Sequence, residues 1–363
     1  MKLFNKKLVK LTKSLNWFWY IFYFLTKKFV ANKKQNLTRN YEILIFDFHL
    51  IGDIVLLTPV LKALKDGDDG YRITLVCGPW AKEVLLEEGL VDDFIFFTAP
   101  WVKNGGFLQS ARSLIGLIKR LRCTKWDIGV DIRGDIRQIL LLYFSGAERR
   151  ISFDFMGGDA LLTDVIRDDG VYRHLLNHHQ LILNKLNIKI APQSFIPKIL
   201  LTEAEQISSA AIQSYVGVHF GASLPLRRLP LTERIKLLEK LAFLKKQIVI
   251  FVPPDEAESI DLLLNSIPSE SRNCISLWRG SIREMIVMIS AAEKIYAMDS
   301  GAAHIAAALG IPTVVLFGPN LPALVAPIGC RVEIREKVGL GCRPCNQINC
   351  TNSINQACLI GIV

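Results

Sequence analysis

The sequence lacks three features that would place it in a well-defined class. A membrane-spanning helix needs about 20 consecutive apolar residues, whereas the strongest apolar run near the amino terminus covers only residues 15–25. No basic helix has groove-reading spacing, and no aromatic RNA-binding signature is found, so nucleic acid is not an expected partner. The small-residue cleavage pattern that ends a secretory signal peptide is also missing after the run. These absences argue against a spanning, a nucleic-acid-binding and a secreted protein.

Acidic residues are in short supply. The 363 residues include 34 Asp and Glu against 44 Lys and Arg, which gives a formal net charge of +10. Half of the residues are hydrophobic, and the mean hydropathy of +0.29 is high for a soluble protein. A basic and apolar chain indicates an anionic partner near an apolar surface. Membrane phospholipid, a phosphorylated glycolipid and a nucleoside diphosphate all fit this description.

The amino-terminal segment, residues 1–34, combines aromatic and basic residues. The run 15–25 is rich in Trp, Phe and Tyr, and lysines flank it at Lys6, Lys7, Lys10, Lys13, Lys27, Lys28, Lys33 and Lys34. Aromatic rings at headgroup level and lysines against anionic lipid are typical of an interfacial anchor. We therefore expect a membrane-surface segment followed by a polar linker at 32–40. The alternatives are a signal or spanning segment and a helix packed on the fold itself.

From residue 41 onward, short apolar runs alternate with longer amphipathic ones, as in parallel βαβ units. The chain is too long for one core, so we expect an α/β protein with two doubly wound domains that face a cleft. The expected boundaries are 1–40 for the membrane-associating segment and linker, 41–195 and 196–335 for the domains, and 336–363 for a cysteine-rich tail. Expected strands are 43–47, 72–77, 94–97, 127–131, 216–220, 247–252, 294–298 and 313–317. Expected helices are 54–65, 108–122, 203–214, 231–244, 282–292 and 301–309.

Ligands of open α/β sheets bind where strands end and helices begin. The first such turn contains Gly52 and Asp53. The glycine permits close backbone approach, and the carboxylate suits acid–base chemistry. An ordinary helix N-cap is the simpler explanation for an aspartate at this position.

Two turns in the second half indicate anion and ribose binding. Gly221, Ala222 and Ser223 form a small-residue loop whose N–H groups can approach an anion, and Arg227 follows it. An ordinary loop with a solvated arginine is the alternative. After the strand at 247–252, Glu256 could accept hydrogen bonds from ribose hydroxyls, although acidic residues also favour a helix start electrostatically.

The most specific turn is the block that begins Asp299-Ser300-Gly301-Ala302 and continues to His304. Small residues through the first helical turn leave backbone N–H groups accessible to a phosphate. Ser300 can cap the helix. His304 lies one turn further on the same face, where a structural role and a binding role are equally expected.

Cysteines cluster only in the tail. Cys342, Cys345, Cys350 and Cys358 have a spacing that could hold zinc or an iron–sulfur cluster. The other four, at 77, 123, 274 and 330, are scattered, so the chain is no disulfide-rich secreted scaffold. From the spacing alone, a metal site and reduced structural thiols both stay open for the tail.

These turns, in this order, resemble glycosyltransferase family 9, the bacterial heptosyltransferases of lipopolysaccharide core assembly. The resemblance runs from about residue 41 to the carboxyl terminus. It includes Thr58-Pro59, the turn 131–137, the segment 145–151, the Asp299–His304 block and the cysteine tail. The family implies the GT-B fold, with two Rossmann-like domains, and transfer with inversion at the anomeric carbon.

The resemblance assigns roles to individual residues. Asp53 would be the catalytic base; Gly52, Arg133 and Arg137 would bind the acceptor. The donor-binding set would be Gly221, Ala222, Ser223, Arg227, Glu256, Asp299, Ser300, Gly301, Ala302 and His304. Family members usually carry Lys and Trp-Pro in the donor loop, where this chain has Arg227 and Leu229-Pro230.

The resemblance also implies the partners. The donor would be a nucleotide sugar, in the first place ADP-heptose, and the acceptor a lipopolysaccharide-core or related glycolipid at the cytoplasmic face of the inner membrane. No metal or other cofactor is expected for catalysis. Two other hypotheses stay open: a catalytically lapsed GT-B protein that only binds nucleotide or glycan, and a cysteine-cluster redox or metal protein.

Overall fold

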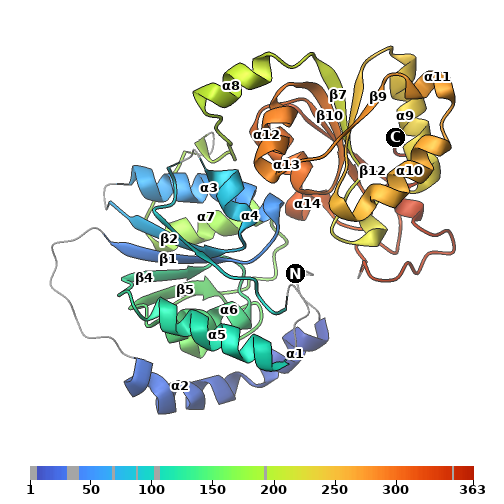
Figure 1. Cartoon of the computed structure of the whole chain (residues 1–363). Coiled ribbons are helices and arrows are strands. Elements are labelled where there is room, and N and C mark those ends of the chain that lie inside the picture. Colours follow the sequence, from blue (N-terminus) through green and yellow to red (C-terminus); the bar gives the residue numbers. More distant parts are fainter. Residues whose placement is uncertain are drawn as a thin grey trace. The chain divides into compact units, whose positions relative to one another are not determined.

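The computed structural model contains two parallel-sheet α/β units (Figure 1). One unit is formed by residues 1–49 and 57–195, and the other by residues 50–56 and 196–363. The residues that the structure describes are 6–30, 41–67, 70–86, 89–101, 107–191, 194–345 and 347–363. The expected linker at 32–40 lies outside these residues.

The N-terminal unit is built on a six-stranded sheet of order β3-β2-β1-β4-β5-β6, in which every pair is parallel. The strand order places β1 and β4 at the centre, and both are buried on both faces, as expected for a sheet covered by helices. Its strands are β1 (Glu42–Asp47), β2 (Arg72–Cys77), β3 (Asp93–Phe96), β4 (Ile128–Asp131), β5 (Arg149–Phe153) and β6 (Asp164–Ile166). The helices after residue 41 are α3 (Ile51–Asp66), α4 (Trp80–Leu85), α5 (Phe107–Leu121), α6 (Ile136–Ser145), η1 (Asp159–Leu161) and α7 (Leu175–Lys185).

The C-terminal unit repeats this plan with a second parallel sheet of order β12-β11-β10-β7-β8-β9. Its strands are β7 (Tyr215–His219), β8 (Ile248–Phe251), β9 (Ile275–Trp278), β10 (Ala292–Met298), β11 (Thr313–Phe317) and β12 (Val332–Glu336). Its helices are α8 (Glu203–Ala210), η3 (Pro225–Arg227), α9 (Leu231–Phe243), η4 (Pro254–Glu256), α10 (Ala257–Asn265), α11 (Ser269–Arg272), α12 (Ile282–Ser290), α13 (Gly301–Ala308), α14 (Pro322–Val325) and η5 (Ala357–Leu359). The carboxyl ends of the adjacent strands β10, β7 and β8 therefore lie at one edge of the sheet.

The expected fold class of two doubly wound units is confirmed. All eight expected strands are present within one or two residues, and the sheets contain four further strands, β5, β6, β9 and β12. The expected helix 203–214 ends early, because α8 stops at Ala210 and β7 begins at Tyr215.

Two helices precede the first sheet: α1 (Lys6–Ser14) and α2 (Asn16–Val30). Figure 1 shows them in blue along the lower side of the N-terminal unit. The half-buried Trp19, Phe22 and Tyr23 of α2 pack on the unit's hydrophobic core. Among the helices that the structure describes, none is both long and apolar enough to cross a membrane.

Candidate active site

Asp53 lies in the first turn of α3 but is not its N-cap. The carbonyl of Leu50 accepts the first helical hydrogen bond, from the N–H of Ile54 at 3.3 Å, so Leu50 is the capping residue and Asp53 is the third residue of the helix. The Asp53 carboxylate reaches back and accepts a 3.1 Å hydrogen bond from the N–H of Leu50. This is the acidic half of a capping box. The simple N-cap explanation is corrected accordingly, and the half-buried carboxylate stays partly accessible.

The turn after β4 is organised by the fully buried Asp131. Its carboxylate accepts hydrogen bonds from the N–H groups of Arg133, Gly134 and Asp135 and from the hydroxyl of Ser152, at 2.7–3.2 Å. Burial raises the pKa of Asp131 to about 7, although these hydrogen bonds act in the opposite direction. The buried carboxylate thus fixes the loop that carries the predicted acceptor residue Arg133.

Arg137, the second residue of α6, is held by two different contacts. Asp135 caps α6 through the N–H of Arg137 and also binds the Arg137 guanidinium, with Nε 2.9 Å from Oδ1. The guanidinium lies 4.8 Å from the centre of the Trp101 ring, which is a cation–π distance. The Arg137 side chain is 38% exposed, so its charge is both pre-oriented and partly accessible to solvent.

In the C-terminal unit, β7 and β10 bring His219 and Ser300 together. The Ser300 hydroxyl lies 3.2 Å from Nδ1 of His219 and makes no cap bond to α13. The expectation that Ser300 caps through its side chain is therefore not met in the structure. Burial lowers the pKa of His219 to about 4, which keeps the imidazole neutral at pH 7. The first-turn N–H groups of α13, at Gly301 and Ala302, are left for a different acceptor, such as an anion.

Arg227 and Asp299 form an ion pair beside the start of α13. Nη1 of Arg227 lies 3.5 Å from Oδ2 of Asp299, and the Asn320 amide donates to the same oxygen at 3.0 Å. Burial raises the pKa of Asp299, while Arg227 and Asn320 counteract that rise. The arrangement holds a part-exposed guanidinium where β10 ends, so two predicted donor residues meet as expected from their positions.

Glu256 is deeply buried, with 1% of its surface exposed. Arg234 binds its carboxylate at 2.9 Å and Arg228 at 3.1 Å. Arg228 also donates to the Ala222 carbonyl at 3.1 Å. In this arrangement Glu256 anchors the loop that follows β7; a direct contact to ribose stays a prediction.

Gly221 is required by close packing. A Cβ atom at this position would lie 2.5 Å from Cγ of Pro253 and 2.9 Å from the His219 ring. Both approaches are shorter than carbon atoms tolerate, so a glycine allows the loops after β7 and β8 to approach each other. Ala222 and Ser223 continue this loop without regular structure.

His304 lies in the first turn of α13, with only 6% of its surface exposed. Its backbone N–H donates to the Ser300 carbonyl at 3.4 Å. The remaining residues of this helix from Ala302 to Ala308 are all buried as well. The helix is therefore a core element, and Gly301 at its amino end is its only partly exposed residue.

The carboxyl-terminal tail returns to the donor loop. The Gln356 amide donates to the carbonyls of Leu226 and Arg228 at 3.3 and 2.8 Å, and Gln347 accepts from Nε of Arg227. Sequence reasoning missed this support, together with His219 and Asn320. No local pattern identifies such partners, because Gln356 lies about 130 positions from the loop it holds.

The four tail cysteines line one small cavity together with Leu226 and Pro319. All of them are free thiols. In the part of the chain that the structure describes, no three or more His, Cys, Asp or Glu side chains are grouped as a metal site. The sulfurs of Cys345 and Cys350 accept backbone N–H groups at 3.3 Å. These contacts order the tail that supports Arg227.

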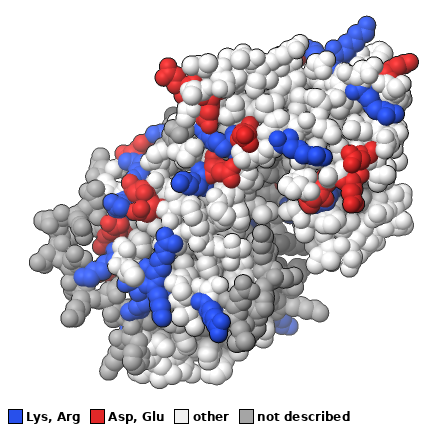
Figure 2. Space-filling view, viewed as in Figure 1, with Lys and Arg blue, Asp and Glu red and all other residues white. Residues whose placement is uncertain are grey.

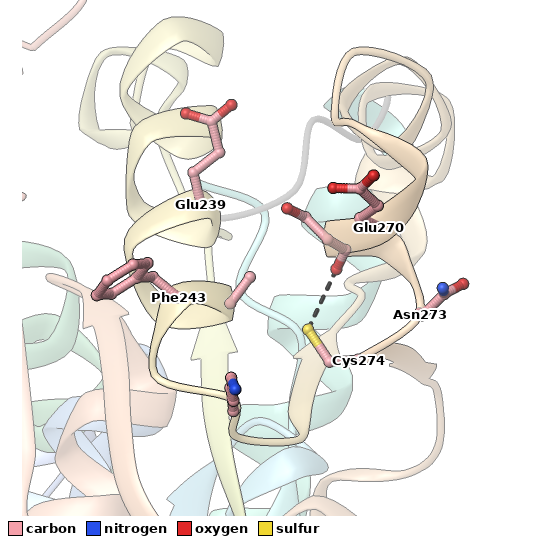
Figure 3. Close-up of a pocket in the computed structure, with 8 residues that line it drawn as sticks. Glu239, Phe243, Glu270, Asn273 and Cys274 are labelled. Carbon is pink, nitrogen blue, oxygen red and sulfur yellow. Dashed lines mark hydrogen bonds between the residues drawn. The ribbon is translucent and has the colours of Figure 1, made fainter.

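A larger open hollow lies elsewhere in the C-terminal unit, between α9 and α11 (Figure 3). It has a volume of about 460 Å³ and is lined by Glu239, Phe243, Glu270 and Cys274 among others. The Cys274 thiol donates to the Ser271 carbonyl at 3.1 Å. None of the predicted site residues lines this hollow, so it is not the candidate active site.

Residues 114–355 match the family described as glycosyltransferase family 9 (heptosyltransferase). The match covers more than half of the chain. The chain belongs to glycosyltransferase family 9. It is therefore a glycosyltransferase, and the parallel-sheet units described above are the two halves of this enzyme's fold.

Individual relatives agree with the family assignment. The chain is 23% identical over 309 residues to lipopolysaccharide heptosyltransferase 2 of Escherichia coli, which covers 81% of this chain and 87% of that protein. It is 22% identical over 312 residues to lipooligosaccharide heptosyltransferase 2 of Haemophilus influenzae, with 81% and 88% covered.

A solved structure extends the likeness to the fold. The structure of E. coli ADP-heptose lipopolysaccharide heptosyltransferase II matches with a TM-score of 0.69 at 20% identity, covering 82% of this chain and 91% of that one. At this identity the likeness shows the fold alone. The roles of individual residues stay predictions.

Proposed function

We propose that this glycosyltransferase moves a heptose from ADP-heptose to the core of a lipopolysaccharide or a related glycolipid, with inversion at the anomeric carbon. The relatives are described as lipopolysaccharide and lipooligosaccharide heptosyltransferases, and one solved relative is described with ADP-heptose. The observation that carries the proposal is the Arg227–Asp299 pair beside the start of α13.

The donor diphosphate is proposed to bind at that position. The N–H groups of Gly301 and Ala302 and the guanidinium of Arg227 supply positive charge without a metal ion. Stabilising the departing nucleoside diphosphate in this way lowers the barrier to cleavage of its bond to the sugar. The N–H groups of Ala222 and Ser223 would add to this binding, and Glu256 keeps their loop in place through Arg228.

Asp53 is proposed as the catalytic base. Its carboxylate would take the proton from the acceptor hydroxyl as that oxygen bonds to the anomeric carbon from the face opposite the diphosphate. A nearby negative charge also stabilises the positive charge that develops on the sugar in an oxocarbenium-like transition state. Arg133 and Arg137 would bind anionic groups of the acceptor. The predicted approach of the acceptor to the Gly52 backbone is not supported, because the His304 ring lies 2.7 Å from where a Cβ atom of Gly52 would be.

The proposed place of action is the cytoplasmic face of the inner membrane. Nucleotide sugars are cytoplasmic, whereas a glycolipid acceptor is held in the bilayer, so an enzyme that joins them works at that interface. The aromatic and basic segment 1–34 is the part of the chain suited to this position.

The test is a panel of nucleotide sugars incubated with the full-length protein and a heptose-deficient lipopolysaccharide core. We expect ADP-heptose to be consumed with transfer to the core, and NMR of the product to show the inverted anomer. If a hexose from another nucleotide sugar is transferred in preference to heptose, the proposed donor is wrong. Retention of configuration would exclude direct displacement.

The second candidate is a protein that binds nucleotide sugar without turnover. The departure at Leu229, where family members carry Trp, is the feature that favours it. Slow hydrolysis of the bound donor separates the two candidates, since a lapsed protein binds the donor but leaves it intact.

A further inference from the structure

The N-terminal helix α2 has two opposite apolar faces, of which the N-terminal unit covers one. On that face Trp19, Phe22 and Tyr23 pack on the core cluster around α6. The Thr26 hydroxyl lies 2.8 Å from the Tyr143 hydroxyl. The helix is thus docked on the unit rather than suspended from it.

The other face exposes a stripe of large apolar side chains. Trp17, Phe18, Ile21, Phe24 and Leu25 expose 63%, 43%, 48%, 68% and 66% of their surface. Their spacing of i, i+1, i+4, i+7 and i+8 places them along one side of the helix. A contiguous apolar stripe of this kind marks a surface that another body covers.

The charges carried by α1 and α2 themselves are of one sign, and Lys13 of α1 lies 3.9 Å from Asp168 of the N-terminal unit. Residues 1–41 contain no Asp or Glu, and the exposed Lys10, Lys13 and Lys27 lie on the same two helices. Helix α5, which packs on the same core cluster, belongs to a stretch, 107–126, with five basic and no acidic residues. Figure 2 shows blue side chains predominating over that part of the N-terminal unit. A second copy of the chain would bring like charges together across the stripe, whereas an anionic lipid surface complements it.

The docked helices also contact the loop next to the predicted acceptor residues. Oδ1 of Asn16 accepts from the N–H of Gly158 at 3.2 Å, and a Cβ at Gly157 would lie 3.1 Å from the Thr12 carbonyl. A Cβ at Gly158 would in turn lie 2.3 Å from Cδ1 of Ile136, the first residue of α6. Arg133 lies in the loop that precedes α6, and Arg137 is the second residue of that helix.

We propose that α1 and α2 lie flat on an anionic phospholipid surface, with the stripe Trp17–Leu25 among the lipid headgroups, and that their docking holds the acceptor-binding loop of the N-terminal unit at that surface. The lipid-binding part of this proposal depends only on the exposed side chains of α1 and α2. The part about the acceptor-binding loop rests on the proposed function.

The first experiment measures co-sedimentation of the full-length protein with vesicles of phosphatidylcholine containing phosphatidylglycerol. The triple variant Trp17→Ser, Phe24→Ser, Leu25→Ser should bind at least tenfold more weakly at an unchanged melting temperature. The matched control, Ile207→Ser, Leu262→Ser, Val338→Ser, removes equally exposed apolar groups from the C-terminal unit and should bind as the wild type does. Neutral phosphatidylcholine vesicles should bind the wild type more weakly than anionic ones.

Three results would overturn lipid binding: equal binding by the triple variant and the wild type, equal loss in the control variant, or no wild-type binding to anionic vesicles. In the last case light scattering shows whether a second copy covers the stripe. Should the triple variant unfold, Lys10→Gln with Lys13→Gln and Lys27→Gln tests the same surface, and an unchanged affinity for anionic vesicles would then overturn the proposal.

The second experiment compares a lipid-embedded acceptor with its deacylated, water-soluble form. The triple variant should lose at least tenfold in kcat/KM for the embedded lipopolysaccharide core and keep its kcat/KM for the soluble form. Equal losses on both would refute positioning at the membrane while leaving lipid binding intact. A wild type that binds vesicles and transfers sugar to neither acceptor would refute the proposed function instead.

Discussion

Asp53 is the residue at which structural and chemical roles can be separated by substitution. Because its carboxylate accepts from the Leu50 N–H, Asp53→Asn keeps an acceptor, whereas Asp53→Ala removes it and should cost about 1 kcal/mol of stability. Neither variant can take a proton, so both should lose on the order of 10²–10⁴-fold in turnover. Turnover, melting temperature and donor affinity are to be measured together.

A matched control for this prediction exists on the same helix. Asp66→Asn changes an exposed carboxylate at the far end of α3, where it pairs with Lys62, and should leave turnover unchanged. A folded Asp53→Asn variant with near-normal turnover would leave this residue a capping group and remove it from the mechanism.

Arg227 is predicted to act through its charge on the donor. A charge-assisted hydrogen bond contributes about 1.5–3 kcal/mol, so Arg227→Ala should weaken ADP-heptose binding by roughly 10- to 150-fold in calorimetry. Binding of the acceptor should change little. Arg331→Ala, at the amino end of β12 and thus the opposite edge of the sheet, is the control. Equal donor affinities of the two variants would show that the Arg227 charge does not meet the diphosphate.

Asp131 should make stability depend on pH near neutrality. Its pKa is raised to about 7 by burial, compared with about 4 in an unfolded chain. The folded protein therefore holds a proton that the unfolded chain releases, and stability is lost as the pH rises from about 4 to 7. Asp131→Asn abolishes this contribution.

The check is the melting temperature of both proteins from pH 5 to 8. The melting temperature of the variant minus that of the wild type should increase as the pH rises. His219 and His178, whose pKa values burial lowers to about 4, act in the opposite direction but are common to both proteins. A difference that does not vary with pH would show that Asp131 stays ionised when buried.

At the scale of elements, the loops after β7 and β8 are predicted to depend on Gly221. Gly221→Ala forces a methyl group to within 2.5 Å of Pro253, and such overpacking typically costs 1–3 kcal/mol. We expect a lower melting temperature and weaker donor binding. Gly341→Ala adds its methyl group where no atom lies within 4 Å and should change neither; similar effects of both substitutions would refute the packing argument.

The elements that sequence reasoning located are those with the clearest hydrophobic pattern. β1 and β10 are central strands of their sheets, and their ends placed Asp53 and the start of α13 correctly at strand-to-helix turns. β12 was missed because Val332–Glu336 alternates apolar and charged residues at a sheet edge. β5 was missed because it begins with two arginines. Such strands are missed when only continuous apolar runs are taken as the signal.

The sequence predicted that the candidate site residues lie at strand ends, but it did not predict their contacts. The composition of the block 299–304 predicts a helix start. The Ser300–His219 contact and the burial of Glu256 between two arginines, however, depend on segments that are distant in sequence. Tertiary packing decides which polar groups face one another, and a single sequence does not record it.

For the whole molecule, catalysis is expected to be independent of metal. Turnover should be unchanged by a chelator, and elemental analysis of pure protein should show less than stoichiometric zinc or iron. Stoichiometric metal whose removal lowers the melting temperature without affecting turnover would assign it a structural role in the cysteine tail. Loss of turnover together with the metal would instead support a metal-dependent enzyme.

The tail that supports the donor loop has a consequence for synthesis of the protein. Gln347 and Gln356 hold a loop made more than a hundred codons earlier. While the ribosome is still translating the codons before these glutamines, the nascent chain already contains Arg227 and the start of α13 but not the amides that orient the loop. A message truncated ahead of codon 347 would thus yield a product with every proposed donor-binding residue but with a loop at Arg227 that lacks its support.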